Sequence, residues 1–197
     1  MRSMSRLLII QGHPDGSAPH LCHALADAYA AGALDAGHEL RRVELALLDF
    51  PLLRSQAEWQ QGALPAGLQE AQDAIAWCQH LLIVFPLWLG DMPALLKGFL
   101  EQVARPGFAF QSEGNNMLAK KGLAGRSARV LVTMGMPAAL YRYYFRAHSL
   151  KSLERNILGF VGIAPVHETL VGGVEGLSEA ARKKWLARLR KLGSEAA

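Results

Sequence analysis

The chain has 197 residues, of which 51% are hydrophobic and 19% are charged, and its formal net charge is +4 at pH 7. This composition excludes a disordered chain and supplies enough apolar residues for the core of a single domain, residues 1–197. No aromatic-plus-basic motif accompanies the positive charge, which argues against nucleic-acid binding. The five-residue apolar run near the start is too short for a signal peptide or a membrane span, so we expect a cytoplasmic protein without membrane insertion.

Strand-like and helix-like patterns alternate from the beginning of the chain. The apolar run at residues 6–11 predicts a strand buried on both faces, and residues 18–35 predict the helix after it. Residues 38–45 predict a second strand that is polar enough for a sheet edge. Residues 48–67 form a connector without a clear period, and residues 68–78 predict the next helix.

The second half of the chain continues this alternation. Strands are expected at 81–86, 128–135 and 165–171, helices at 92–104, 139–158 and 178–192, and a polar loop at 111–127. Five strands alternating with helices, without a repeat or a linker, predict an α/β fold with one doubly wound parallel sheet and helices on both faces. Such a five-stranded sheet commonly has the flavodoxin-like order 2-1-3-4-5, with ligands beyond the carboxyl ends of strands 1 and 3.

The first loop at that edge is "GHPDGSAPH", residues 12–20. The helix after it offers free N–H groups and the positive end of its dipole, which together hold a phosphate. Ser17 is placed to cap this helix or to donate to a phosphate oxygen, and His13 and His20 could add donors. Pro19 suits a first helical turn. The alternative is an ordinary loop in which Ser17 is only an N-cap.

Two further loops are expected at the same edge. The segment "FPLWLGDMP", residues 85–93, presents flat apolar side chains that suit an aromatic ring system, unless Trp88 simply packs over the sheet. In "TMGMPAALYRYYF", residues 133–145, Gly135 lets the backbone approach a ligand closely. The amides of Gly135 and Met136 could then face a ligand oxygen.

Together these motifs resemble the flavodoxin-fold NAD(P)H:quinone oxidoreductases, a family that includes mammalian quinone reductases, bacterial modulator-of-drug-activity proteins and ancillary subunits of potassium-efflux systems. The resemblance covers nearly the whole chain, and "FPLWLGDMPALLKGFLEQV" followed by "GFAF" is its most specific stretch. It implies a bound flavin, FAD or FMN, with NAD(P)H as co-substrate. It also implies hydride transfer through the flavin to a quinone or similar electrophile, with ping-pong kinetics.

The resemblance assigns site residues by their position in the sequence. The expected cofactor-binding residues are His13, Ser17, Ala18, Pro19 and His20 at the phosphate, Pro86, Leu87, Trp88 and Leu89 along the ring, Thr133, Gly135 and Met136 at its pyrimidine edge, and Arg182 at the outer end of the cofactor. Tyr141 and His148 are the expected catalytic residues, which assist when negative charge develops on the reduced ring. Cys22 and Cys78 show no zinc spacing, so no metal is expected.

Relatives in this family are homodimers with active sites at the subunit boundary, so a homodimer is expected. The apolar stripe in residues 95–103 would serve as dimer surface or would pack against the sheet. The alternative to an enzyme is that the protein serves as a flavin-binding regulatory subunit of a potassium-efflux transporter. A flavodoxin-like electron carrier is a third reading, against which the basic charge argues, and a phosphate-ligand enzyme without flavin is a fourth.

Overall fold

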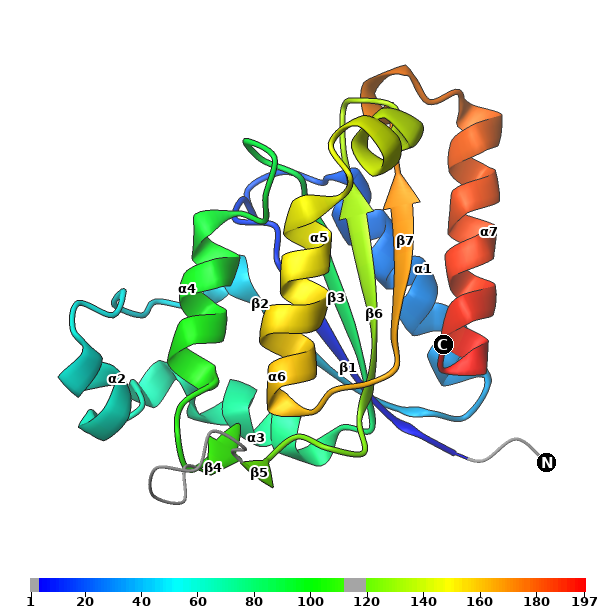
Figure 1. Cartoon of the computed structure of the whole chain (residues 1–197). Coiled ribbons are helices and arrows are strands. Elements are labelled where there is room, and N and C mark those ends of the chain that lie inside the picture. The colour runs from blue at the N-terminus through cyan, green and yellow to red at the C-terminus, as the bar shows by residue number, and fades with distance from the viewer. Residues whose placement is uncertain (1–3, 112–119) are drawn as a thin grey trace.

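The computed structural model describes residues 4–111 and 120–197. Its centre is a five-stranded parallel sheet with helices on both faces (Figure 1). The strands are β1 (Arg6–Gln11), β2 (Glu39–Glu44), β3 (His80–Pro86), β6 (Ser127–Thr133) and β7 (Val166–Val171), and they lie in the order β2-β1-β3-β6-β7. The expected order is therefore confirmed, and β2 is an edge strand as its polar sequence predicts.

The helices form two layers around the sheet (Figure 1). They are α1 (Leu21–Asp35), α2 (Gln56–Gln61), α3 (Gln69–Trp77), α4 (Ala94–Val103), α5 (His148–Ser152), α6 (Gly159–Val161) and α7 (Glu179–Glu195). Helices α1 and α7 cover one face, while α3, α4, α5 and α6 cover the other. In the described residues no helix is long and apolar enough to span a membrane.

Helices α1 and α7 touch backbone to backbone. A Cβ atom added to Gly32 would lie 1.8 Å from the Arg190 carbonyl oxygen, and one added to Gly193 would lie 2.0 Å from that of Tyr29. Only glycine allows this approach. The resulting core around Tyr29 is separate from the core on the opposite face, because the sheet lies between them.

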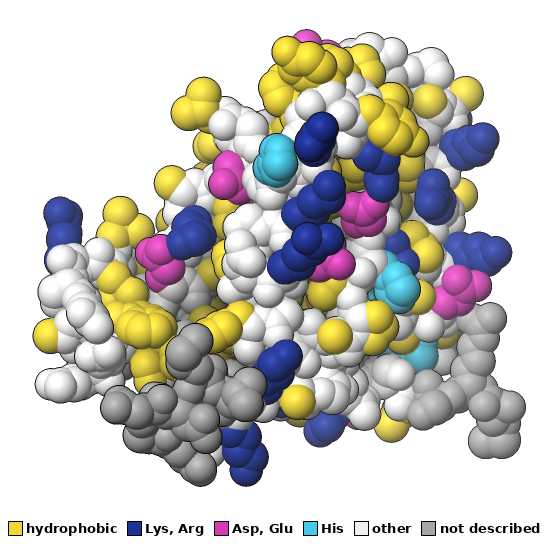
Figure 2. Space-filling view, in the orientation of Figure 1, with side chains coloured by type: hydrophobic (Ala, Val, Ile, Leu, Met, Phe, Trp, Pro, Cys, Tyr) yellow, Lys and Arg dark blue, Asp and Glu magenta, His cyan; other side chains and the backbone are white. Residues whose placement is uncertain are grey.

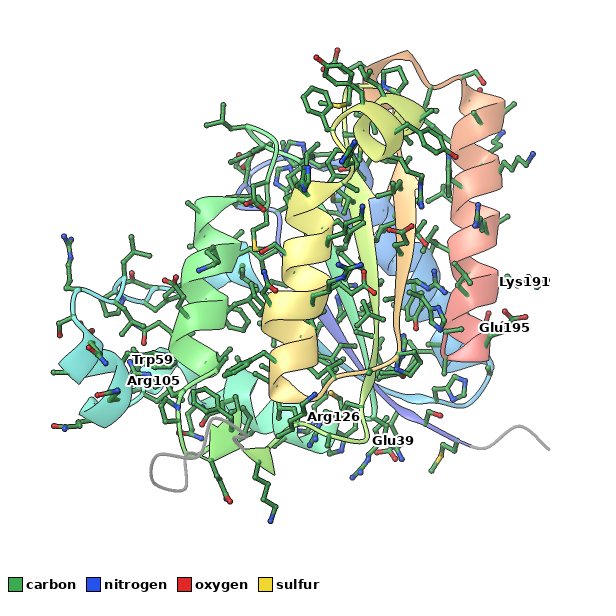
Figure 3. All side chains as sticks on the ribbon, viewed as in Figure 1. Glu39, Trp59, Arg105, Arg126, Lys191 and Glu195 are labelled. Carbon is green, nitrogen blue, oxygen red and sulfur yellow. The ribbon has the colours of Figure 1, made fainter. Side chains whose placement is uncertain are left out.

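The connector before β3 contains a short helix that the sequence analysis missed. Ser55 caps α2 by accepting a hydrogen bond from the Glu58 amide at 3.1 Å. Arg105, labelled in Figure 3, donates to the carbonyl oxygens of Glu58 and Gly62 at 3.0 and 2.6 Å. This six-residue helix is too short for a periodic apolar pattern to reveal it, and tertiary contacts hold it in place.

Two expected helices differ in the structure. Helix α1 begins at Leu21, three residues later than expected, because the N-cap is His20 and Ser17 instead bonds to Asp15. Pro19 consequently lies before the helix. The expected helix at 139–158 is interrupted: π-helical turns at 140–144 and 153–158 flank α5, and Arg146 and Ala147 have φ angles of +53° and +48°.

Other expectations hold in outline. The expected polar loop at 111–127 begins in β4 (Phe110–Gln111) and includes β5 (Lys120–Lys121), while its residues 112–119 lie outside the described part of the chain.

In the stripe at 95–103, Leu96, Phe99, Leu100 and Val103 are buried against the sheet. That stripe is therefore core, and the proposed use as dimer surface is wrong for these side chains.

Candidate active site

A crevice lies beyond the carboxyl ends of β1, β3 and β6, where the strand order reverses. Its volume is about 490 Å³. It is lined by His13, Asp15, His20, Leu21, Cys22, Pro86, Leu87, Trp88, Thr133, Met134, Gly135, Val174 and Glu175. A second hollow of about 560 Å³ lies between α2, α4 and α6 and shares no lining residue with the crevice. The crevice is the candidate site, because sheets of this kind bind ligands beyond their carboxyl ends.

The turn at residues 12–20 folds around the carboxylate of Asp15. One carboxylate oxygen accepts hydrogen bonds from the Ser17 amide at 2.8 Å and the Ser17 hydroxyl at 2.6 Å. The other lies 2.8 Å from Nε2 of His20. The bonds from Ser17 and then His20 hold the pKa of Asp15 well below its ordinary value. The donors that the sequence assigned to a phosphate thus already hold an anionic group.

Three histidines gather at this turn. The rings of His13 and His20 are stacked, with centroids 3.9 Å apart and planes at 16°, and the His23 ring centroid lies 5.3 Å from that of His13. Nδ1 of His13 lies 3.1 Å from the amide nitrogen of Asp15 and 3.2 Å from its carbonyl oxygen, so the ring is anchored to the backbone of the turn. Burial, followed by the neighbouring His20 and His23, lowers the pKa of His13. In the described residues no cluster of His, Cys, Asp or Glu could hold a metal ion.

The loop after β3 gives the crevice an apolar wall. Trp88 and Asp91 exchange two backbone hydrogen bonds of 2.9 Å around the turn formed by Leu89 and Gly90, whose φ angles are +48° and +80°. Tight turns between antiparallel segments favour positive φ at both central residues. The turn leaves Trp88 half-exposed with its ring edge-on to His13, the centroids 5.9 Å apart. Leu89 is fully exposed and does not line the crevice.

The loop after β6 supplies free backbone donors. Within the described residues, the amides of Gly135 and Met136 make no hydrogen bond. The Met136 carbonyl oxygen accepts a bond from the Gly173 amide at 3.0 Å, which fixes this loop against the turn after β7. A Cβ atom added to Gly135 would lie 3.5 Å from a Glu175 carboxylate oxygen, so Glu175 borders this end of the crevice.

Both expected catalytic residues and Arg182 lie outside the crevice lining. Tyr141 is buried, and its hydroxyl lies 2.7 Å from the Ser149 hydroxyl and accepts a bond from the Leu150 amide at 3.2 Å. Its side chain therefore holds the first turn of α5. His148 and Arg182 are exposed. The catalytic roles of Tyr141 and His148 and the cofactor contact of Arg182 stay predictions.

The crevice nevertheless gathers residues from all three expected loops. Those in its lining are His13, His20, Pro86, Leu87, Trp88, Thr133 and Gly135, whereas Ser17, Ala18, Pro19 and Leu89 are exposed outside it and Met136 is half-buried. The sequence analysis missed Asp15, Leu21, Cys22, Met134, Val174 and Glu175. The signal for Val174 and Glu175 was the turn "VGGVEG" after the last strand, because all strands of a parallel sheet end at the same edge.

Comparison with known proteins gives a consistent result. The flavodoxin-like fold family matches residues 5–192. An uncharacterised NAD(P)H oxidoreductase of Haemophilus influenzae is 27% identical over 180 residues, covering 89% of this chain and 88% of that protein. An FMN-dependent NADH:quinone oxidoreductase of Macrococcus caseolyticus is 24% identical over 202 residues, covering 91% and 92%.

A solved structure shows the same fold. The NAD(P)H:quinone oxidoreductase from Methanothermobacter marburgensis aligns with a TM-score of 0.76 at 23% sequence identity, covering 98% of this chain and 96% of that one. These matches confirm both the expected fold class and the resemblance inferred from the sequence.

Proposed function

The chain belongs to the flavodoxin-like fold family, and we propose that it is a flavin-dependent NAD(P)H oxidoreductase that reduces quinones or similar electrophiles. Two similar proteins are named for NAD(P)H oxidation and quinone reduction, which supports this reaction class. The observation that carries the proposal is the arrangement around one crevice of a turn whose donors hold the Asp15 carboxylate, an apolar wall, and two free amides, of which that of Gly135 belongs to the lining.

The residues present fit a flavin, which combines an anionic phosphate end, a flat ring system and a hydrogen-bonding ring edge. The turn around Asp15 offers donors for an anion, and Trp88 stands at the apolar wall. The amides of Gly135 and Met136 have no partner within the described residues. Gln11 is buried directly before this turn and outside the crevice lining; its Oε1 accepts the His13 amide at 3.3 Å, and its Nε2 lacks a partner among the described residues.

When bound, the flavin would accept hydride from NAD(P)H and pass it to the acceptor. We expect Ser17 and His20 to donate to its phosphate and residues 86–88 to lie along its ring. The amides of Gly135 and Met136 would donate to an oxygen at the ring edge, since preorganised donors stabilise negative charge. NAD(P)H and the acceptor would occupy the crevice in turn, which predicts ping-pong kinetics.

An exposed apolar surface supports a homodimer. Trp88 and Leu89 after β3, and Leu140, Tyr143, Tyr144 and Phe145 after β6, are each at least 44% exposed. Figure 2 shows hydrophobic side chains gathered at the end of the molecule where the β6–α5 segment lies. Patches of this kind mark interaction sites. A second copy on this surface would place the crevice at the subunit boundary, and a Tyr143→Glu/Tyr144→Glu variant should be monomeric by light scattering.

The decisive test is the visible spectrum of the purified protein with added FAD or FMN, followed by NADPH under nitrogen. A flavin band that bleaches with NADPH and returns with a quinone would support the proposed enzyme. Absence of binding by either flavin would reject it. If flavin binds but turns over with no quinone, the regulatory subunit of a transporter becomes the better reading. Two free, buried cysteines suit a reducing compartment, and we propose the cytoplasm.

A further inference from the structure

Asp15 occupies the donors that a cofactor phosphate would need. Its carboxylate takes the Ser17 amide, the Ser17 hydroxyl and Nε2 of His20, at 2.8, 2.6 and 2.8 Å. A phosphate bound through the same groups has to displace this carboxylate or share donors with it. This competition exists only if a flavin binds in the crevice, so the inference rests on the proposed function.

One buried donor that directly precedes the turn, Nε2 of Gln11, is not used by Asp15. Gln11 is fully buried, and its amide orientation is fixed because Oε1 accepts the His13 amide at 3.3 Å. The Nε2 atom beside it is left without a partner in the described residues. This unpaired donor directly precedes the turn, outside the crevice lining, and is independent of the Asp15 contacts.

The charges around the crevice favour a phosphate group with one negative charge over a phosphate group with two. Asp15 and Glu175 both line it, and the lining contains no lysine or arginine. The remaining titratable groups are His13 and His20 in the lining, His23 behind them, and the Cys22 thiol, whose pKa burial raises to about 11. A phosphate monoester carries close to two negative charges near pH 8, whereas each phosphate of a pyrophosphate diester carries one. Like charges repel in proportion to the charge product.

We propose that Asp15 is a specificity-determining residue that disfavours the phosphate monoester of FMN relative to the pyrophosphate diester of FAD. Its carboxylate competes for the donors of Ser17 and His20 and repels the monoester more strongly. Riboflavin, which has no phosphate, escapes both effects. The three flavins therefore separate the contribution of phosphate charge from that of the ring.

The test compares dissociation constants of riboflavin, FMN and FAD by flavin fluorescence at pH 8 and fixed ionic strength. In Asp15→Asn we expect FMN to bind about tenfold more tightly, FAD about threefold more tightly, and riboflavin unchanged. Asp27→Asn is the matched control: it removes the same charge from an exposed residue of α1 that pairs with Arg42 outside the crevice. It should leave all three constants unchanged. Thermal unfolding confirms that each variant is folded.

Several results would overturn the inference. They are weaker FMN binding in Asp15→Asn, an equal change for all three flavins, or the same FMN effect in Asp27→Asn. Glu175→Gln gives a second reading, with a smaller gain for FMN expected because this carboxylate lies at the other end of the lining. If wild-type protein binds none of the three flavins, the proposed function itself is rejected, and the inference falls with it.

Discussion

The Sγ atom of Cys22 lies 3.0 Å from the Oγ1 atom of Thr133, so the first turn of α1 is tied to the last residue of β6. Both side chains are buried, and both line the crevice. Because α1 follows β1 and the order of the sheet is β1-β3-β6, this contact reaches across the end of β3. These two side chains form the floor of the crevice, and their contact holds it together although they lie 111 positions apart in the sequence.

We expect neither cysteine to react in the native protein. Burial raises the pKa of Cys22 and of Cys78 to about 11, and the thiolate is the reactive form. Ellman's reagent at pH 8 should therefore detect no rapidly reacting thiol before denaturation and two after it. A fast-reacting thiol that disappears in Cys22→Ala would show that the floor of the crevice opens in solution.

Two neighbouring glycines should respond differently to a methyl group. In Gly135→Ala the new Cβ would lie 3.5 Å from Glu175 Oε1, an ordinary contact, so stability should change by less than about 0.5 kcal/mol. In Gly172→Ala it would lie 2.2 Å from the Ala138 amide nitrogen, which should destabilise the fold by about 1–3 kcal/mol. Urea unfolding measures both variants.

Flavin titration of Gly135→Ala tests whether the ring edge of the flavin lies at Gly135. Gly135→Ala should weaken flavin binding about tenfold despite its stable fold, because the methyl group projects beside the free amides. Unchanged flavin affinity in this variant would argue against the ring edge lying at Gly135. Loss of stability in Gly135→Ala, with Gly172→Ala unaffected, would contradict the backbone arrangement of both loops.

Tyr141→Phe should affect stability more than chemistry. The hydroxyl bonds to Ser149 and accepts the buried Leu150 amide, so its removal should cost about 1–2 kcal/mol of unfolding free energy. Stopped-flow reduction of bound flavin by NADPH should change by less than about twofold, since the side chain does not line the crevice. A large fall in reduction rate at unchanged stability would support the catalytic role that the sequence analysis expects for Tyr141.

The strands and their order were predictable because their signal is local. Residues 6–11 and 81–86 are continuous apolar runs, as strands buried on both faces require, and the structure places β1 and β3 there. The alternation of strands with helices then leaves few topologies. The three loops at the strand ends followed from this topology, so His13, Trp88 and Gly135 were found without any knowledge of side-chain positions.

The helix break and the side-chain contacts of the site depend on tertiary structure, so they were harder to predict. Residues 139–158 contain no proline or glycine, so nothing local marks the break at Arg146 and Ala147. Ser17 looked like a helix cap because serine often is one, but Asp15 two residues earlier competes for its hydrogen bonds. Glu175 reaches the crevice because β7 lies beside β6, as the predicted strand order already implied, but the sequence analysis did not extend the site to the turn after the last strand.

Stability should fall as the pH drops from about 6.5 to 4, because of His80. Its ring is buried at the start of β3, with Nδ1 2.7 Å from the Ser127 hydroxyl. Burial, followed by the charge of Arg129 and the proximity of His167, lowers its pKa to about 4, below the ordinary value of 6.5. Between these values the unfolded chain takes up a proton that the folded protein excludes, so the unfolding free energy decreases by about 3 kcal/mol across the window.

Urea unfolding at pH 7, 5.5 and 4.5 checks this dependence. The slope attributable to His80 should vanish in His80→Asn, which cannot titrate, and should remain in His167→Asn, which removes an exposed histidine close to it. Both variants are needed because acid also protonates carboxylates. Their contribution to the pH dependence of stability is the same in the two variants, so a difference between the variants reports on His80. If His80→Asn loses stability with the same slope as the wild type, the acid sensitivity arises elsewhere, and the buried ring at the start of β3 is not its source.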